Sequence, residues 1–188
     1  MKSYDCILTD PPWPVTTNRG TSSGRPGVAY PTMSVEDVLV KLEIAAAIIP
    51  SYGFMVVMAP DLFRTPLDRP IAHLERRRPG VWWKTSAGMG YGMKRDFEDI
   101  HYWTGPNWSP RTNICGVLPV PRGHDRYCTA KPALLWHYLL EAFARPGWVV
   151  YDPFAGGGSV REAAELLGME AILEDLPVVQ SSLDKIRA

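Results

Sequence analysis

Residues 148–174 are WVVYDPFAGGGSVREAAELLGMEAILE, and the order of residue types in this stretch decides the fold. The apolar run at 148–152 predicts a buried strand, and a helix from about 159 to 167 follows the glycine-rich turn. A second short run, 170–173, predicts the next strand. This order is typical of a parallel sheet that binds ligands at the carboxyl ends of its strands.

The same alternation of strands and helices is found upstream. Apolar runs predict strands at 4–9, 53–59, 81–84 and 99–104. Helices are predicted after an N-cap at Ser34, with Asp37 three residues on, and at 71–78, 132–144 and 181–187. The expected apolar side of the 132–144 helix consists of Leu134, Leu135, Tyr138, Leu139 and Phe143. We predict an α/β fold in which residues 1–188 form one domain, with helices on both faces of a mostly parallel sheet.

Composition narrows the functional classes. The 20 basic and 20 acidic side chains cancel, which argues against a protein that holds nucleic acid by counterion release alone. The first residues lack a signal-peptide layout, and no apolar run approaches the roughly 20 residues of a membrane span. We expect a cytoplasmic protein with no membrane partner. Cys115, His124 and Cys128 include no CxxC pair, so no metal site is expected.

The glycine-rich turn predicts a nucleoside site. Glycines there let the backbone approach a ligand closely, and Glu174 follows the next strand. A carboxylate at that place can hold both hydroxyls of a ribose. The alternative is an ordinary turn with a surface acid. The turn lacks the GxxxxGK[ST] pattern, so a nucleotide phosphate is not the expected ligand.

A second motif, Asp10-Pro11-Pro12-Trp13, ends the first predicted strand. The amino group of a nucleobase is a poor nucleophile because its lone pair is delocalised into the ring. Asp10 and the carbonyl of Pro11 can accept its two N–H bonds, and the two prolines preorganise that carbonyl. Trp13 offers a flat face on which an extruded base can stack. The alternative is a strand-ending turn with a core tryptophan.

Together the two motifs resemble the DPPW branch of the N6-adenine methyltransferases, in the permuted order of the beta-type DNA enzymes. Further stretches are similar to family motifs: Tyr30 to Ser34 (Y-x-T-M-S), Val81 to Lys84 with Gly90 and Arg95 to Glu98 (W-x-K…G…R-x-x-E), and Thr129 to Pro132 (T-x-K-P). The resemblance implies a Rossmann-like class I methyltransferase fold and S-adenosyl-L-methionine as cofactor.

The resemblance also implies roles for individual residues. Asp10, Pro11, Pro12 and Trp13 would hold the target amino group. The cofactor residues would be Asp152, Pro153, Phe154, Gly156, Gly158 and Glu174, with Thr129 and Lys131 near its methionine end. Tyr30 and Lys84 are candidate target contacts.

Two further segments are candidates for nucleic-acid contact. Arg19 and Arg25 lie in a polar, glycine-rich loop, 16–27, which is predicted to be mobile and beside the catalytic motif. The segment 105–128, irregular from 107 to 127, is a candidate target-recognition surface. The run Arg76 to Arg78 is interpreted as a solvated helix end, with phosphate contact as the alternative.

The sequence therefore predicts methyl transfer to N6 of adenine in DNA. The acid at position 10 favours adenine, since cytosine-N4 enzymes tend to use a serine there. RNA N6-adenine methylation, DNA N4-cytosine methylation and a non-catalytic nucleic-acid-binding partner subunit are the alternatives. The short chain leaves little room for target recognition, so we expect a homodimer, a partner subunit or a very short recognition sequence.

Overall fold

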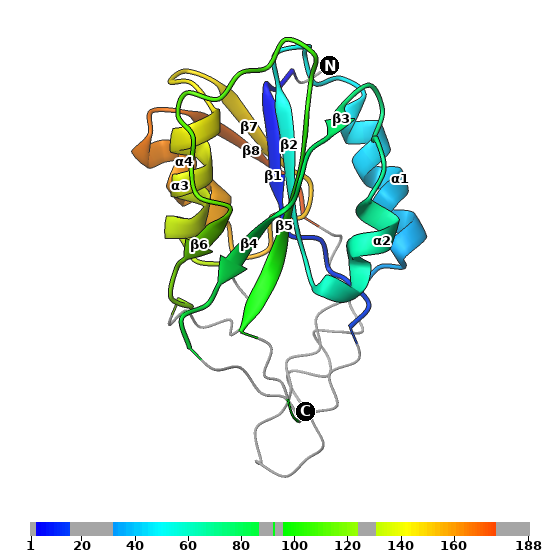
Figure 1. Ribbon diagram of the computed structural model, residues 1–188. Coiled ribbons are helices and arrows are strands. Elements are labelled where there is room, and N and C mark those ends of the chain that lie inside the picture. Colours follow the sequence, from blue (N-terminus) through cyan, green and yellow to red (C-terminus); the bar gives the residue numbers. More distant parts are fainter. Residues whose placement is uncertain (1–2, 16–31, 87–91, 93–95, 124–130, 176–188) are drawn as a thin grey trace, which may run out of the picture.

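One mixed sheet forms the centre of the computed structural model, which describes residues 3–15, 32–86, 92, 96–123 and 131–175 (Figure 1). Its strands are β1 (Cys6–Thr9), β2 (Phe54–Ala59), β3 (Glu75–Arg76), β4 (Gly80–Trp83), β5 (Phe97–Thr104), β6 (Val117–Pro119), β7 (Val149–Asp152) and β8 (Glu170–Leu173). The helices are α1 (Val35–Ala46), α2 (Arg64–Leu67), α3 (Ala133–Phe143) and α4 (Ser159–Leu166), with a 3-10 turn, η1 (Asp61–Phe63).

The strand order is β6-β4-β5-β2-β1-β7-β8, with β3 also pairing with β5. Strands β2, β1, β7 and β8 are parallel, whereas β5 runs antiparallel to both β2 and β4. Helices α1 and α2 cover one face and α3 and α4 the other (Figure 1). The predicted α/β, Rossmann-like fold is therefore confirmed. No described helix has the length and apolarity to cross a bilayer.

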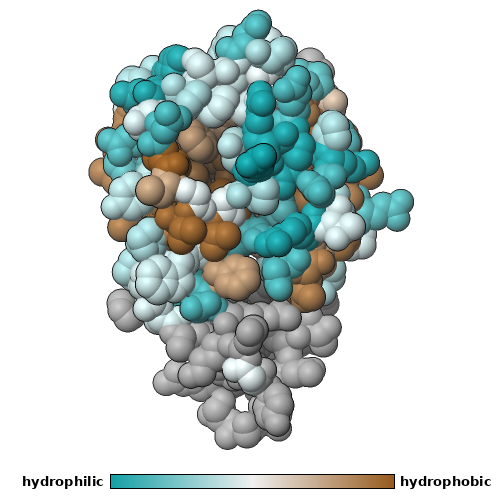
Figure 2. Space-filling model, in the orientation of Figure 1, coloured by the Kyte–Doolittle hydropathy of each residue, from teal (hydrophilic) through white to brown (hydrophobic). Residues whose placement is uncertain are grey.

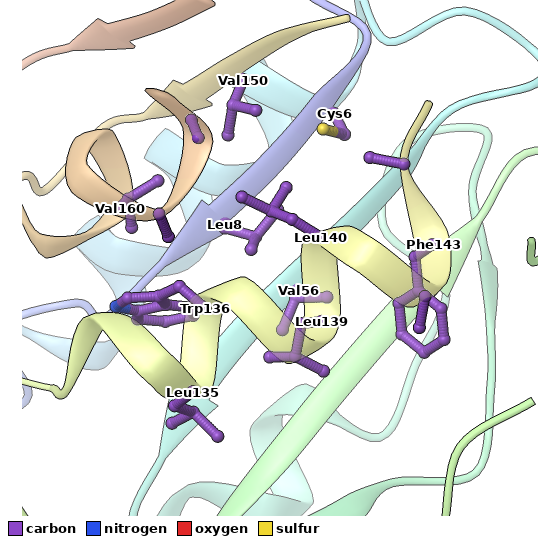
Figure 3. Packing of buried hydrophobic residues seen from close by; sticks show 14 of the residues in the cluster. Cys6, Leu8, Val56, Leu135, Trp136, Leu139, Leu140, Phe143, Val150 and Val160 are labelled. Atoms are coloured by element: carbon purple, nitrogen blue, oxygen red, sulfur yellow. The ribbon is translucent and has the colours of Figure 1, made fainter. Parts of the chain in front are cut away.

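The alternation of side chains along the central strands divides the core into two layers. In β2, Val56 packs with the α3 and α4 side, while Met55 and Val57 pack with the α1 and α2 side. Figure 3 shows Val56 near Leu139 of α3. Because both faces are covered, the strand is apolar at every position, as the run in the sequence predicted.

The N-cap of α1 and the buried side of α3 can be compared with the predictions made for these two helices. Ser34 is the N-cap of α1, and its hydroxyl accepts a hydrogen bond from the backbone N–H of Asp37 at 3.0 Å, as predicted. In α3, however, Leu134 and Tyr138 are exposed, whereas Trp136 is buried and its Nε1 donates to Ser159 of α4. The buried side of α3 is rotated because the helix packs on α4 as well as on the sheet.

The helix predicted at 71–78 is wrong. The chain turns at Ile71–Leu74, where Ala72 has a φ of 51°, and then enters strand β3. Arg76 is not part of a solvated helix end, because its side chain is 10% exposed and its Nη2 lies 2.7 Å from Nδ1 of His101. Pairing of β3 with β5 thus overrides the local helical spacing. The predicted irregular segment also contains a strand, β6.

Asp99 on β5 supports a stability prediction. Its carboxylate is fully buried and accepts two hydrogen bonds from Arg64, at 2.8 and 2.7 Å. Arg64→Ala leaves this buried charge without its cation, so we expect a loss of about 2 kcal/mol in unfolding free energy, moderated because Arg64 is half exposed. Arg69→Ala is the control: it removes an exposed ion pair with Glu43 and should cost about 0.5 kcal/mol or less. Urea denaturation measures both, and equal losses would contradict the prediction.

Candidate active site

The two sequence motifs meet at the carboxyl edge of the sheet. Strand β1 ends before Asp10, and β7, which ends at Asp152, is its parallel neighbour. The Thr9 hydroxyl donates to Oδ1 of Asp152 at 2.6 Å, and the N–H of Phe154 donates to the same oxygen at 3.0 Å. Burial raises the pKa of Asp152 to about 7, against the opposing effect of these two hydrogen bonds. Asp152 therefore joins the glycine-rich turn to the residue that immediately precedes Asp10.

Asp10 belongs to a chain of alternating charges. Its Oδ2 accepts from Nζ of Lys131 at 2.5 Å, and the same Nζ lies 3.2 Å from Oε2 of Glu98. Lys84 donates to the other oxygen of Glu98 at 2.5 Å. Two carboxylates and two ammonium groups thus neutralise one another within a largely buried cluster.

These contacts set the protonation of the cluster. Burial raises the pKa of Asp10 to about 6, and the charge of Lys131 opposes this rise. Burial alone would lower the pKa of Lys131, but Asp10 and Glu98 raise it above its ordinary value. Among the described residues no donor contacts Oδ1 of Asp10, and the side chain is 28% exposed. Near neutral pH, Asp10 is therefore an ionised acceptor with one accessible oxygen.

The backbone after Asp10 is held by two hydrogen bonds between main-chain groups. The Pro11 carbonyl accepts from the N–H of Trp13 at 2.8 Å, and the Pro12 carbonyl accepts from the N–H of Met33 at 2.9 Å. A carbonyl oxygen has two lone pairs, so the Pro11 oxygen can accept one further hydrogen bond. Its direction is fixed by the turn, as the two prolines led us to expect.

Trp13 does not have the position predicted for it. The side chain is 3% exposed, its ring stacks on Phe63 at a centroid distance of 4.8 Å, and its Nε1 donates to the Met58 carbonyl at 2.9 Å. Because its polar atom and a ring face are already engaged, the predicted stacking of an extruded base on Trp13 is wrong for this structure. Trp13 instead anchors the Asp10–Trp13 segment to β2.

The glycine-rich turn has the backbone that its sequence requires. Gly156 and Gly158 have φ values of 48° and 76°, a left-handed conformation that side chains disfavour. The N–H of Ala155 donates to the Glu174 carbonyl, and the N–H of Glu174 donates to the Asp152 carbonyl, both at 2.9 Å. These bonds fix the turn beside the end of β8, at the amino end of α4.

Glu174 lies beside this turn with a half-exposed carboxylate. Its Oε1 lies 3.2 Å from Nζ of Lys41, and its Oε2 accepts from the hydroxyl of Tyr151. Pro153 and Phe154 are buried, so they support the turn from within the core. Glu174 is accordingly an acid beside this turn that a ligand can reach.

Two of the remaining predicted site residues lie at a different part of the site than the sequence predicted. Lys131, predicted at the cofactor, contacts Asp10, and Lys84, predicted at the target, reaches the same cluster through Glu98. Glu98 was missed as a site residue, although the R-x-x-E similarity already included it. The loop 16–27, the helix at 181–187 and four predicted site residues lie outside the described residues: Arg19, Arg25, Tyr30 and Thr129.

Comparison with known proteins identifies the family. The family model N6_N4_Mtase, described as DNA methylase, matches residues 59–176, so the chain belongs to this DNA methylase family. That match includes Lys84, Glu98, Lys131 and Glu174, whereas Asp10 precedes it. No protein with a curated description matches the chain.

Solved structures share the fold at low sequence identity. The M1.HpyAVI–SAM complex is 18% identical, with a TM-score of 0.67 over 98% of this chain and 89% of that one. The cytosine-N4-specific PvuII DNA methyltransferase is 13% identical, with a TM-score of 0.68 over 93% and 76%. TTHA0409 from Thermus thermophilus, complexed with S-adenosyl-L-methionine, is 18% identical, with a TM-score of 0.60 over 98% and 86%. The chain therefore has the fold of class I methyltransferases.

Proposed function

We propose that this DNA methylase transfers a methyl group from S-adenosyl-L-methionine to N6 of adenine in DNA. The observation that carries the proposal is the accessible carboxylate oxygen of Asp10, held beside the glycine-rich turn by the bond between Thr9 and Asp152. An acid at this position favours adenine over cytosine. M1.HpyAVI and TTHA0409, which share the fold, have been crystallised with the same methyl donor.

In the proposed mechanism the chain orients and activates the amino nitrogen. Oδ1 of Asp10 and the Pro11 carbonyl each accept one N–H bond, which directs the nitrogen lone pair toward the donor. The cofactor supplies an electrophilic methyl on a sulfonium. Transfer would break the S–C bond as the N–C bond forms, and Asp10 would be the adjacent acceptor for the proton that the nitrogen then loses. No covalent enzyme intermediate is required.

The residues around the glycine-rich turn fit the nucleoside part of this cofactor. Gly156 and Gly158, which adopt a left-handed backbone, present no side chain to a ligand, and the Glu174 carboxylate is exposed next to the turn. Glu174 would accept hydrogen bonds from the ribose hydroxyls, as in other nucleoside-binding α/β domains. Asp152 would act indirectly, by holding the turn in place.

Glu174→Ala should therefore raise the Kd for S-adenosyl-L-methionine about tenfold or more, because a charge-assisted hydrogen bond is lost. At saturating cofactor the methylation rate should stay close to that of the wild type. Isothermal calorimetry measures the first quantity and a radiolabel assay the second. Glu170→Ala is the matched control, an exposed acid at the start of the same strand, and should leave the Kd unchanged. A normal Kd in Glu174→Ala would contradict the cofactor assignment.

The target base and polymer are tested with oligonucleotides that carry adenine or cytosine as the only methylatable base. DNA and RNA versions are incubated with labelled cofactor, and the products are digested and identified by mass spectrometry. We expect N6-methyladenine in DNA. N4-methylcytosine, or methylation of RNA alone, would contradict the proposed substrate. Cofactor binding without transfer to any oligonucleotide would instead indicate a non-catalytic partner subunit.

We further propose that residues 1–188 act as one methyltransferase domain inside the cell, where DNA is accessible. The segment 105–128 is the proposed target-recognition segment. Its strand β6 pairs with β4, which ends one residue before Lys84 of the charge cluster.

A further inference from the structure

We propose that Trp83 and Phe97 form a stacking platform for an unpaired base that neighbours the target base in the nucleic-acid strand. The inference rests on the proposed function and adds a contact apart from Asp10 and Pro11, which are assigned to the reacting base. It assigns a binding role to two aromatic residues that the DPPW motif and the glycine-rich turn leave unexplained.

The two rings are neighbours on a sheet face that is open to solvent. Trp83 of β4 and Phe97 of β5 are direct cross-strand partners, so their side chains leave the same face of the sheet from neighbouring positions. Their exposed fractions are 45% and 38%, although large aromatic residues are usually buried in a core. All seven tryptophans lie in the described part of the chain, and Trp83 is the only exposed one. Its Nε1 lies 3.3 Å from Oδ2 of Asp96, which holds the ring by one edge.

The platform lies at the edge of the sheet where the charge cluster is found. Trp83 immediately precedes Lys84, and Phe97 immediately precedes Glu98, the two residues that continue the chain of charges from Asp10. Side chains alternate along a strand, so the aromatic pair and the charged pair point to opposite faces of the same strand ends. Figure 1 shows these ends at the lower side of the sheet, and Figure 2 shows apolar surface over β4.

The chemistry around the platform suits a polyanion with aromatic bases. The N–H of Val120 donates to the Trp83 carbonyl at 3.1 Å, and the exposed Arg122 follows two residues later. Arg122 is close enough to contribute to the lowered pKa of Lys84, which results mainly from burial. The same strand ends thus carry an exposed aromatic pair on one face and a nearby cation, a combination that suits a single-stranded nucleic acid, with a base stacked on the rings and a phosphate paired with the guanidinium. We therefore assign the surface to a base of the substrate and not to a protein partner.

The test uses the full chain, a short single-stranded DNA containing one target adenine, and two variants of the same residue. Trp83→Ala should raise the Kd for this DNA about tenfold, and Trp83→Phe, which keeps an aromatic face, should bind like the wild type. Tryptophan fluorescence should be quenched when DNA binds to the wild type, and the quenching should be largely lost in Trp83→Ala. Leu166→Ala, which removes an exposed apolar side chain on α4, is the control and should change nothing.

A second DNA, with an abasic site beside the target on one side or the other, tests the stacking contact itself. On one of these two DNAs, wild type and Trp83→Ala should bind equally weakly, because the base that stacks is missing. The inference is overturned if Trp83→Ala binds the intact DNA normally, or if it changes the oligomeric state in sedimentation and so marks a protein interface. If either result is found while the enzyme still methylates adenine in DNA, only the stacking platform is refuted and the proposed function is retained. If the wild-type protein methylates no DNA, the proposed function itself is refuted.

Discussion

Asp10→Ala is expected to lower methyl transfer by about 10²–10³-fold or more, while the Kd for S-adenosyl-L-methionine stays close to that of the wild type. Asp10 supplies the carboxylate that accepts an N–H bond of the target amino group, and nothing else at the end of β1 replaces it. The cofactor contacts assigned to Glu174 and the glycine-rich turn do not involve Asp10. Single-turnover methylation and calorimetry separate the two effects.

Asp61→Ala is the matched control for this experiment. Asp61 lies two residues after the end of β2, the parallel neighbour of β1, but its side chain is exposed in the 3-10 turn η1. This control should retain normal turnover. Unchanged turnover in Asp10→Ala would remove the catalytic role assigned to the residue, and equal losses in both variants would indicate a general effect on the fold.

Lys131→Met is expected to reduce turnover at neutral pH by about 100-fold and to make the enzyme depend on alkaline conditions. In the wild type, the rate should fall as the pH drops through about 6, where Asp10 becomes protonated and can no longer accept an N–H bond freely. The charge of Lys131 opposes the effect of burial on the pKa of Asp10. Without Lys131 that pKa rises, so Asp10 is protonated at neutral pH and ionises only in more basic solution.

The pH–rate profile distinguishes this electrostatic role from a structural one. The acidic limb should move to higher pH in Lys131→Met, with the lost activity partly recovered above it. Lys131→Arg keeps the positive charge beside Asp10 and should keep the limb near its wild-type position. If Lys131→Met lowers the rate equally at every pH, the ion pair does not control the protonation of Asp10.

The sequence predicted the parts of the fold that follow from local patterns. Strand β2 and the N-cap of α1 were identifiable because each has a pattern within a few residues: a continuous apolar run for β2, and a serine followed three residues later by an acid for the N-cap. The region 71–78 was not, because the contacts of Arg76 with β5 come from 25 residues further along the chain. Spacing alone cannot show which segment a strand will pair with.

In the candidate site, too, local patterns were predictable and contacts between residues far apart in the sequence were not. The proximity of Asp10 and Asp152 was predictable, since the carboxyl ends of parallel strands share an edge. The ion pair of Asp10 with Lys131, 121 residues away, was not predictable from the sequence, and neither was the contact of Lys131 with Glu98. Trp13 illustrates a different limit: its residue type fits both stacking on a base and packing in the core, and only its contacts with Phe63 and Met58 in the folded chain distinguish the two.

The pairing of two carboxylates with two lysines also determines how the site meets its substrate. DNA is a polyanion, and an unpaired buried acid at the reaction centre would repel the phosphates that flank the target base. In this cluster Lys131 and Lys84 cancel the charges of Asp10 and Glu98, so the approaching strand meets local dipoles and no net negative field. A chain with 20 basic and 20 acidic side chains can thereby present a carboxylate to DNA without an overall positive charge to overcome the repulsion.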